Sequence, residues 1–136
     1  MEGPARHRPA LLIVDHGTRS KAANQQLEEL ACVVADERPD WLVQHAHMEL
    51  GHPDLATGIE RLIERGASEI LVHLHFLGGG LHVRETIPAL IEEARARHPG
   101  IPILLSEPLG RDPRLAEIVV GRMDDQLRGA RQRSKA

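Results

Sequence analysis

The chain has 136 residues, 41% of them hydrophobic, and a net charge of −3 at pH 7, a size that predicts one domain around a single core. One Phe, one Trp and no Tyr leave little for stacking on bases, and the charge supplies no field for nucleic acid or an anionic membrane. The lone Cys32 cannot form an intramolecular disulfide, and the aliphatic run 11–14 is too short for a signal peptide or a membrane span. We therefore expect a soluble, cytoplasmic protein.

After an irregular, flexible start at residues 1–9, four aliphatic segments alternate with four stretches of helical spacing. The aliphatic segments are each short enough for one strand, and they cover residues 10–14, 41–48, 69–77 and 101–105. The apolar positions of the predicted helices recur every three or four residues. In chain order they are Ala23, Leu27, Leu30, Ala31 and Val34; Leu55, Ile59, Leu62 and Ile63; Ile87, Leu90, Ile91 and Ala94; and Leu115, Ile118, Val119, Met123 and Leu127.

Turn and capping residues predict where these helices begin and end. Pro53 suits the first position of the second helix and Gly66 its end, while Pro88 is tolerable only in the first turn of the third. Asp112 is the expected N-cap of the fourth helix. Residues 128–136 are basic and nearly free of apolar side chains, so we expect a flexible tail there.

Four strand–helix units predict an α/β fold with a parallel sheet, because right-handed crossovers place helices on both of its faces. A single domain over residues 10–127 accommodates all four units. Ligands of such sheets bind beyond the carboxyl ends of the strands. The functional residues are therefore expected in the four loops that follow the strands.

Histidines occupy two of those loops. His16 directly follows the first strand, and His82 precedes the third helix, so adjacent first and third strands would bring the two together. Imidazole suits divalent transition metals, and an incomplete set of protein ligands leaves positions open for a substrate. His75, near the end of the third strand, is a candidate third ligand or a satisfied polar group of the sheet. Glu49 is a candidate proton acceptor or cation ligand, or an exposed turn residue.

The loop 77–83, "LGGGLHV", raises the possibility of a phosphate cradle. It lacks the Lys-Ser/Thr of a Walker loop and the spacing of a dinucleotide fingerprint, and it follows a third strand rather than a first. The remaining interpretations are a flat surface against a large ligand or a flexible turn. Arg19, Lys21, Arg84 and Arg111 fall in or near the same loops, and such a group of cations suits a polycarboxylate.

Four segments together resemble a known family: "LLIVDHGTRSKAANQQLEELA", "HMELGHPDLATGIERLIERGASEILV", "LGGGLHVRETIPALIEEARARHPGIPI" and "EPLGRDPRLAEIVVGRM". Over residues 10–124 the chain resembles the small CbiX-type sirohydrochlorin cobaltochelatases, which are related to the siroheme ferrochelatases and to the class II chelatases. The resemblance implies a chelatase-like, three-layer α/β sandwich with a four-stranded parallel sheet. It also implies a homodimer that inserts a divalent metal into sirohydrochlorin, in tetrapyrrole biosynthesis of the cobalamin or siroheme type.

Carried onto this chain, the resemblance makes His16 a metal ligand and proton acceptor and His82 the second ligand, with Glu49 at the family's acidic position. The residues implied to contact the tetrapyrrole are Leu50, Leu77, Gly78, Gly79, Gly80 and Leu81, with Arg19 and Arg84 placed for its carboxylates. The metal is a substrate, Co²⁺ or alternatively Fe²⁺ or Ni²⁺, and no prosthetic group is implied.

The chain departs from the family pattern around the candidate site, where the third strand and its loop also lack two prolines that many members have. Asp15 stands where glycine is usual, Thr86 replaces an aspartate, and His75 is an addition. These departures leave open a metal or tetrapyrrole carrier that does not catalyse insertion. A metal-dependent hydrolase would need more carboxylates at the strand ends than Asp15 and Glu49 supply.

Overall fold

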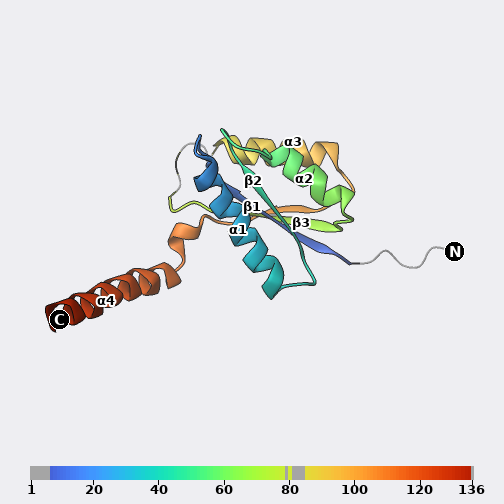
Figure 1. Ribbon diagram of the computed structural model, residues 1–136. Helices are drawn as coiled ribbons and strands as arrows, with labels where there is room; N and C mark the ends of the chain where they lie inside the picture. Colours follow the sequence, from blue (N-terminus) through green and yellow to red (C-terminus); the bar gives the residue numbers. More distant parts are fainter. Residues whose placement is uncertain (1–6, 79, 81–84, 136) are drawn as a thin grey trace.

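The computed structural model describes residues 7–78, 80 and 85–135, which form a central sheet with helices packed on it (Figure 1). Four parallel strands lie in the order β2-β1-β3-β4. Their bounds are β1 Pro9–Asp15, β2 Leu42–His47, β3 Glu69–Leu74 and β4 Ile103–Leu105. The predicted four-stranded parallel sheet is therefore confirmed, and the first and third strands are neighbours as expected.

Three helices cover the sheet in two layers. Helix α1 (Lys21–Glu37) lies against one face, and α2 (Leu55–Glu64) and α3 (Ile87–Arg97) lie against the other. The larger core, between the sheet and α2 and α3, includes Leu12, Val14, Leu55, Ile59, Leu62, Ile70, Val72, Leu74, Ile87 and Ile91. Leu27 and Ala31 of α1 pack on Ile13 in the smaller core. The core is aliphatic because leucine, isoleucine, valine and alanine supply nearly all its apolar volume.

The helix ends follow the predicted capping residues with one correction. Helix α2 begins at Leu55 rather than at Pro53, because the carboxylate of Asp54 accepts the backbone N–H of Thr57 at 2.8 Å and so caps the helix. Gly66 follows the end of α2 with a φ of 98°, and Pro88 lies in the first turn of α3, as predicted.

Helix α4 (Arg114–Lys135) differs most from expectation. Asp112 accepts the backbone N–H of Arg114 at 2.9 Å, as a capping residue does, but the helix then leaves the sheet (Figure 1). The helical spacing of its apolar positions predicts that they are buried within the chain, and this prediction is wrong, since α4 has no buried residue. Residues 128–135, expected as a flexible tail, continue the helix. Within the described part of the chain, no helix has the length and hydropathy to span a membrane.

Candidate functional site

The carboxyl ends of β1 and β2 bring His16 and Glu49 together. Beyond the strands the backbone pairing continues, because Met48 N–H donates to Asp15 O at 2.9 Å and Glu49 N–H donates to His16 O at 3.1 Å. The imidazole Nε2 of His16 lies 3.0 Å from Oε1 of Glu49, and both side chains are about half exposed. The structure thus pairs a base and a carboxylate at the edge where the topology predicts ligands to bind.

Gly17 makes this pairing possible. Its φ is 86°, a conformation that favours glycine, and a methyl group at this position would lie 1.8 Å from the carbonyl oxygen of Glu49. The turn after β1 can therefore press against the backbone of Glu49 only because residue 17 has no side chain. This close approach sets the distance between His16 and Glu49.

A second pair, Asp15 and His47, lies at the ends of the same two strands. His47 is 1% exposed, and its Nδ1 lies 2.6 Å from Oδ1 of Asp15. The ionised carboxylate can only accept, so the imidazole donates this hydrogen bond. From the sequence alone Asp15 is only an added carboxylate at a strand end, and its pairing with His47 is not predicted. The strand register contains the signal, since Asp15 and His47 are direct partners in the β1–β2 ladder.

His75 lies on the other side of the sheet edge from the His16–Glu49 pair. It lines a hollow of about 260 Å³ together with Asp15 and with Gln26 and Leu30 of α1. The ring of His16 instead meets the ring of Phe76 edge-on, with 6.5 Å between centroids. Among the described residues no group of three His, Cys, Asp or Glu side chains could hold a metal ion, so the structure does not join His75 to His16 and Glu49.

The glycine-rich loop lies only partly within the described residues. Gly79, Leu81, His82 and Arg84 are outside them, and so the predicted second metal ligand has no described position. Gly78 and Gly80 are exposed, and Leu77 is 75% exposed. Leu50, on the loop after β2, is also exposed. These residues give the carboxyl edge an apolar surface beside the polar His16–Glu49 pair.

Cationic side chains border two hollows at this edge. Arg19 and Lys21 line one of about 440 Å³ together with His45, and Arg111 lines another of about 470 Å³ together with His73. Burial lowers the pKa of His45, and burial followed by repulsion from His75 lowers the pKa of His73. Both imidazoles therefore favour the neutral form.

A parallel sheet with a histidine–carboxylate pair at its carboxyl edge defines the class as an α/β protein with a candidate ligand site at the ends of its strands. The sequence model of the CbiX family matches residues 10–126, and the chain belongs to that family. It is 33% identical over 117 residues to the chloroplastic sirohydrochlorin ferrochelatase of Arabidopsis thaliana, covering 86% of this chain and 52% of that protein. It is 29% identical to the sirohydrochlorin cobaltochelatase of Methanopyrus kandleri, covering 87% of this chain and 96% of that one.

A solved structure shares the fold. The structure of SirB from Bacillus subtilis with Fe³⁺ matches with a TM-score of 0.79 and 29% identity, over 87% of this chain and 47% of that chain. The chain thus spans about half the length of SirB and of the Arabidopsis relative, but nearly all of the Methanopyrus relative.

Proposed function

We propose that the protein is a sirohydrochlorin chelatase, a lyase-type enzyme that inserts Co²⁺ or Fe²⁺ into sirohydrochlorin. The metals and the tetrapyrrole are those in the names of the relatives. Within this chain, the 3.0 Å pairing of His16 with Glu49 at the carboxyl edge is the observation that carries the proposal. Both the metal and the tetrapyrrole are substrates, and no prosthetic group takes part.

The proposed reaction removes two protons from the macrocycle for each divalent ion inserted. The ring loses two pyrrole N–H protons, its four nitrogens bind the ion, and the overall charge balances. His16 accepts a proton at Nε2, and the carboxylate of Glu49 at 3.0 Å stabilises the imidazolium that forms. Because both side chains are about half exposed, the protons can leave to solvent.

The ion would be held on the way into the ring by His16, Glu49 and His82. Imidazole and carboxylate are suitable donors for Co²⁺ and Fe²⁺, and Ni²⁺ suits the same donors. His75 stays outside this ligand set, since it lines the hollow beside α1. An incomplete protein shell suits the role, because each ring nitrogen must displace a ligand as the ion enters.

In the same proposal the macrocycle lies on the apolar part of the edge. Leu50 and Leu77 are exposed there, and the glycines of the loop, Gly78, Gly79 and Gly80, let a planar ring approach the backbone. The remaining proposed contacts are Leu81, Arg19 and Arg84, the two arginines facing the substrate's carboxylates.

Two copies would form the working unit. The chain spans about half of SirB and of the Arabidopsis relative, and a homodimer of this chain would match their length. A cytoplasmic location stays a prediction of the sequence.

An absorption assay tests the proposal. Sirohydrochlorin is incubated with catalytic amounts of protein and with Co²⁺, Fe²⁺ or Ni²⁺ in turn, and the spectral change of the ring is followed over many turnovers. His16→Ala should reduce the rate by about 10²–10⁴-fold. The matched control is His98→Ala, at the C-cap of α3, which should insert metal at the normal rate. Normal insertion by His16→Ala, or a spectral change that stops at one equivalent as in a carrier, would contradict the proposal.

A further inference from the structure

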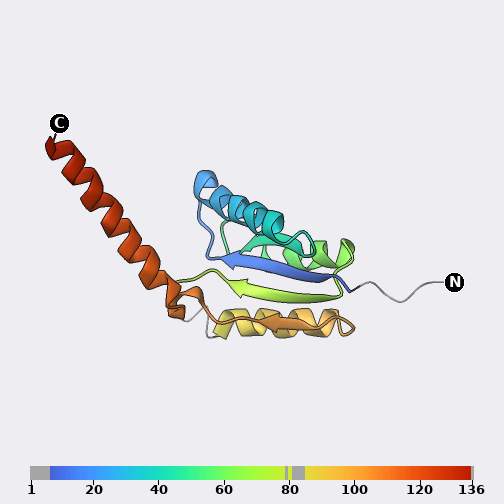
Figure 2. The same ribbon diagram turned by 90° about the horizontal axis from the view of Figure 1, so that it is seen from below.

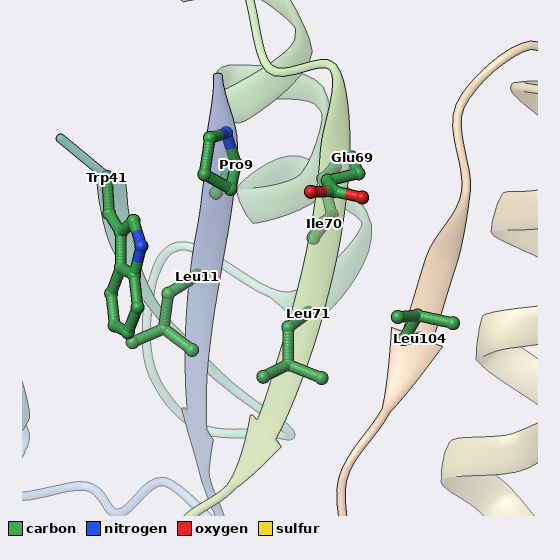
Figure 3. Close-up of a pocket in the computed structure, with 8 residues that line it drawn as sticks. Pro9, Leu11, Trp41, Glu69, Ile70, Leu71 and Leu104 are labelled. Carbon is green, nitrogen blue, oxygen red and sulfur yellow. The ribbon is translucent and has the colours of Figure 1, made fainter. Parts of the chain in front are cut away.

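Strand β3 carries two histidines on the α1 side of the sheet. His73 and His75 are two residues apart, so their side chains point to the same face of the strand. That face also carries Leu71, which Figure 3 shows beside Leu11 of β1, and Leu11 packs with the core of α1. In Figure 2, α1 lies along β1 rather than along β3, and α4 extends away from the sheet. Leu71 is 40% exposed and both histidines are half-buried, so solvent reaches this part of β3.

The two imidazole rings present nitrogen atoms to each other. Nδ1 of His75 lies 3.4 Å from Nε2 of His73, and the ring planes are inclined by 55°. For a hydrogen bond this distance is long, because N–H donors usually lie about 2.7–3.2 Å from their acceptors. Two imidazole nitrogens on one tetrahedral ion, each at about 2.0–2.1 Å, lie about 3.3–3.4 Å apart. The separation therefore matches two ligands of one metal ion better than it matches a hydrogen bond.

The pair lies between two hollows with room for an ion and its bound water. His75 lines the hollow of about 260 Å³ beside α1, and His73 lines the one of about 470 Å³ beside the segment between β4 and α4. A water molecule occupies about 30 Å³ in the liquid, so each hollow can hold several. An ion on the two nitrogens could therefore complete its shell with water.

The charges around the pair do not repel a cation. The hollow beside His73 is lined by two arginines and two carboxylates, namely Arg111, Arg114, Glu107 and Asp112. Nη2 of Arg114 lies 2.7 Å from Oδ2 of Asp112, so these two charges neutralise each other. Asp15 adds a third carboxylate, in the hollow beside His75. Over both hollows, three negative charges thus face two positive ones.

The sheet contains another pair of histidines at the same spacing, which lacks these properties. His45 and His47 share a face of β2, with ring centroids 5.7 Å apart. His47 is 1% exposed, and its Nδ1 donates to the carboxylate of Asp15 at 2.6 Å. One ring nitrogen of this pair is therefore already used within the protein, and its imidazole is closed to solvent.

We propose that His73 and His75 form a second metal site, which binds one divalent transition-metal ion through Nε2 of His73 and Nδ1 of His75. A neutral imidazole carries one proton, on either of its two nitrogens. With those protons on Nδ1 of His73 and Nε2 of His75, the two facing nitrogens both present lone pairs to the ion. Imidazole suits divalent transition metals, whereas Mg²⁺ prefers oxygen ligands, so the site selects the former class.

The second site is open and separate from the one proposed for insertion. Within the described ranges, no three side chains of His, Cys, Asp or Glu surround an ion, so water would fill at least two positions of a tetrahedral shell. An open shell suits an ion that binds and leaves, in contrast to the closed four-ligand shell of a structural site. His16 and Glu49 take no part, so the inference goes beyond the proposed function and does not rest on it.

Equilibrium dialysis on the full chain measures the binding. The test protein carries His16→Ala, Glu49→Ala and His82→Ala, which remove the ligands proposed for insertion, so its result is independent of whether the chain inserts metal. It should bind one Co²⁺ or one Ni²⁺ per chain, Ni²⁺ more tightly than Co²⁺, and both more tightly than Mg²⁺. Loss of a neighbour of a metal ligand already weakens binding by about 10–100-fold. Loss of a ligand itself, in His73→Gln or His75→Gln, should therefore raise the Kd by about 10-fold or more.

The matched control is His45→Gln. His45 and His73 are both register partners of Ile13, one on each side of β1, so the control removes a comparable imidazole from the same face of the sheet. It should leave the Kd unchanged. A test protein that binds neither Co²⁺ nor Ni²⁺ overturns the proposal, and so does an unchanged Kd in His73→Gln or His75→Gln.

Nitrogen NMR of the imidazoles tests the site with both ligands in place. Long-range ¹H–¹⁵N spectra of the test protein are recorded with and without Zn²⁺, and the single variants assign the imidazole signals. Zn²⁺ should shift Nε2 of His73 and Nδ1 of His75 and leave the nitrogens of His45 unchanged. If the signals of His73 and His75 did not move, the 3.4 Å contact would be a hydrogen bond and the proposal would be wrong.

Discussion

Removal of the Asp15 carboxylate should destabilise the fold through His47. The Asp15→Ala substitution leaves an imidazole that is 1% exposed without the acceptor that now lies 2.6 Å from its Nδ1. A buried polar group left without a partner costs about 1–3 kcal/mol. Asp15 itself is 23% exposed, so water can reach the space left by the carboxylate and keep the loss within that range. At about 4 °C per kcal/mol for a domain of this size, the Tm should fall by about 4–12 °C.

Urea denaturation followed by far-UV circular dichroism measures the free energy of unfolding directly. The matched control is Asp40→Ala, which removes a carboxylate from an exposed ion pair with Arg38 and should change the stability very little. Asp15→Asn keeps an acceptor oxygen and should lose less stability than Asp15→Ala. If Asp15→Ala and Asp40→Ala were equally stable, the buried pair would contribute nothing and the reasoning would be refuted.

Three further substitutions test the geometry around the site. Gly17→Ala should lower the free energy of unfolding by about 1–2 kcal/mol for its left-handed backbone alone. It should also slow metal insertion, because the added methyl group would lie 1.8 Å from the carbonyl oxygen of Glu49 and displace that residue. Denaturation curves and initial rates measure the two effects, and a normal insertion rate would show that this close approach does not matter. Burial lowers the pKa of His73 in the folded protein below its ordinary value of 6.5. As the pH falls through 6.5, the imidazole therefore takes up a proton in the unfolded chain before it does so in the folded protein, and the free energy of unfolding decreases. His73→Gln should reduce that decline in denaturation curves between about pH 7.5 and 5.5, and an unchanged slope would argue against it. Asp54→Ala removes the cap of α2 and should lower the free energy of unfolding by about 0.5–2 kcal/mol in the same assay; no loss would mean that water replaces the carboxylate.

Local patterns account for most of the fold that the sequence predicts. Strand segments and helical stripes depend on residues close in the chain, and the topology rules for parallel sheets then fix the neighbours of β1. The start of α2 was misplaced at Pro53 because proline and Asp54 both signal a helix start, and only the hydrogen bond to Thr57 shows which residue caps it.

The burial of α4 was mispredicted for a different reason. A stripe such as Leu115, Val119, Met123 and Leu127 indicates that a helix packs against an apolar surface, but it carries no information on which molecule supplies that surface. The direction of α4 depends on the linker between β4 and α4, residues 106–113, where Gly110 lies against Leu77. No periodicity in the sequence encodes that contact.

At the candidate site, the order of the strands is enough to predict which residues lie close together, but not how every side chain is oriented. The neighbouring ends of β1 and β2 bring His16 and Glu49 together without any knowledge of rotamers. The position of His75 depends on strand alternation, which turns consecutive side chains to opposite faces and so places His75 beside α1 rather than with Phe76 and His16. Proximity to the strand end therefore does not show on which face of the sheet a side chain lies.

The linker to α4 and the candidate site are physically connected. Gly110 donates to the carbonyl of Phe76, and the ring of Phe76 meets His16 edge-on, so the segment that sets the direction of α4 also contacts the neighbour of the proposed base. The direction of α4 and the surroundings of the proposed base therefore depend on the same segment of chain.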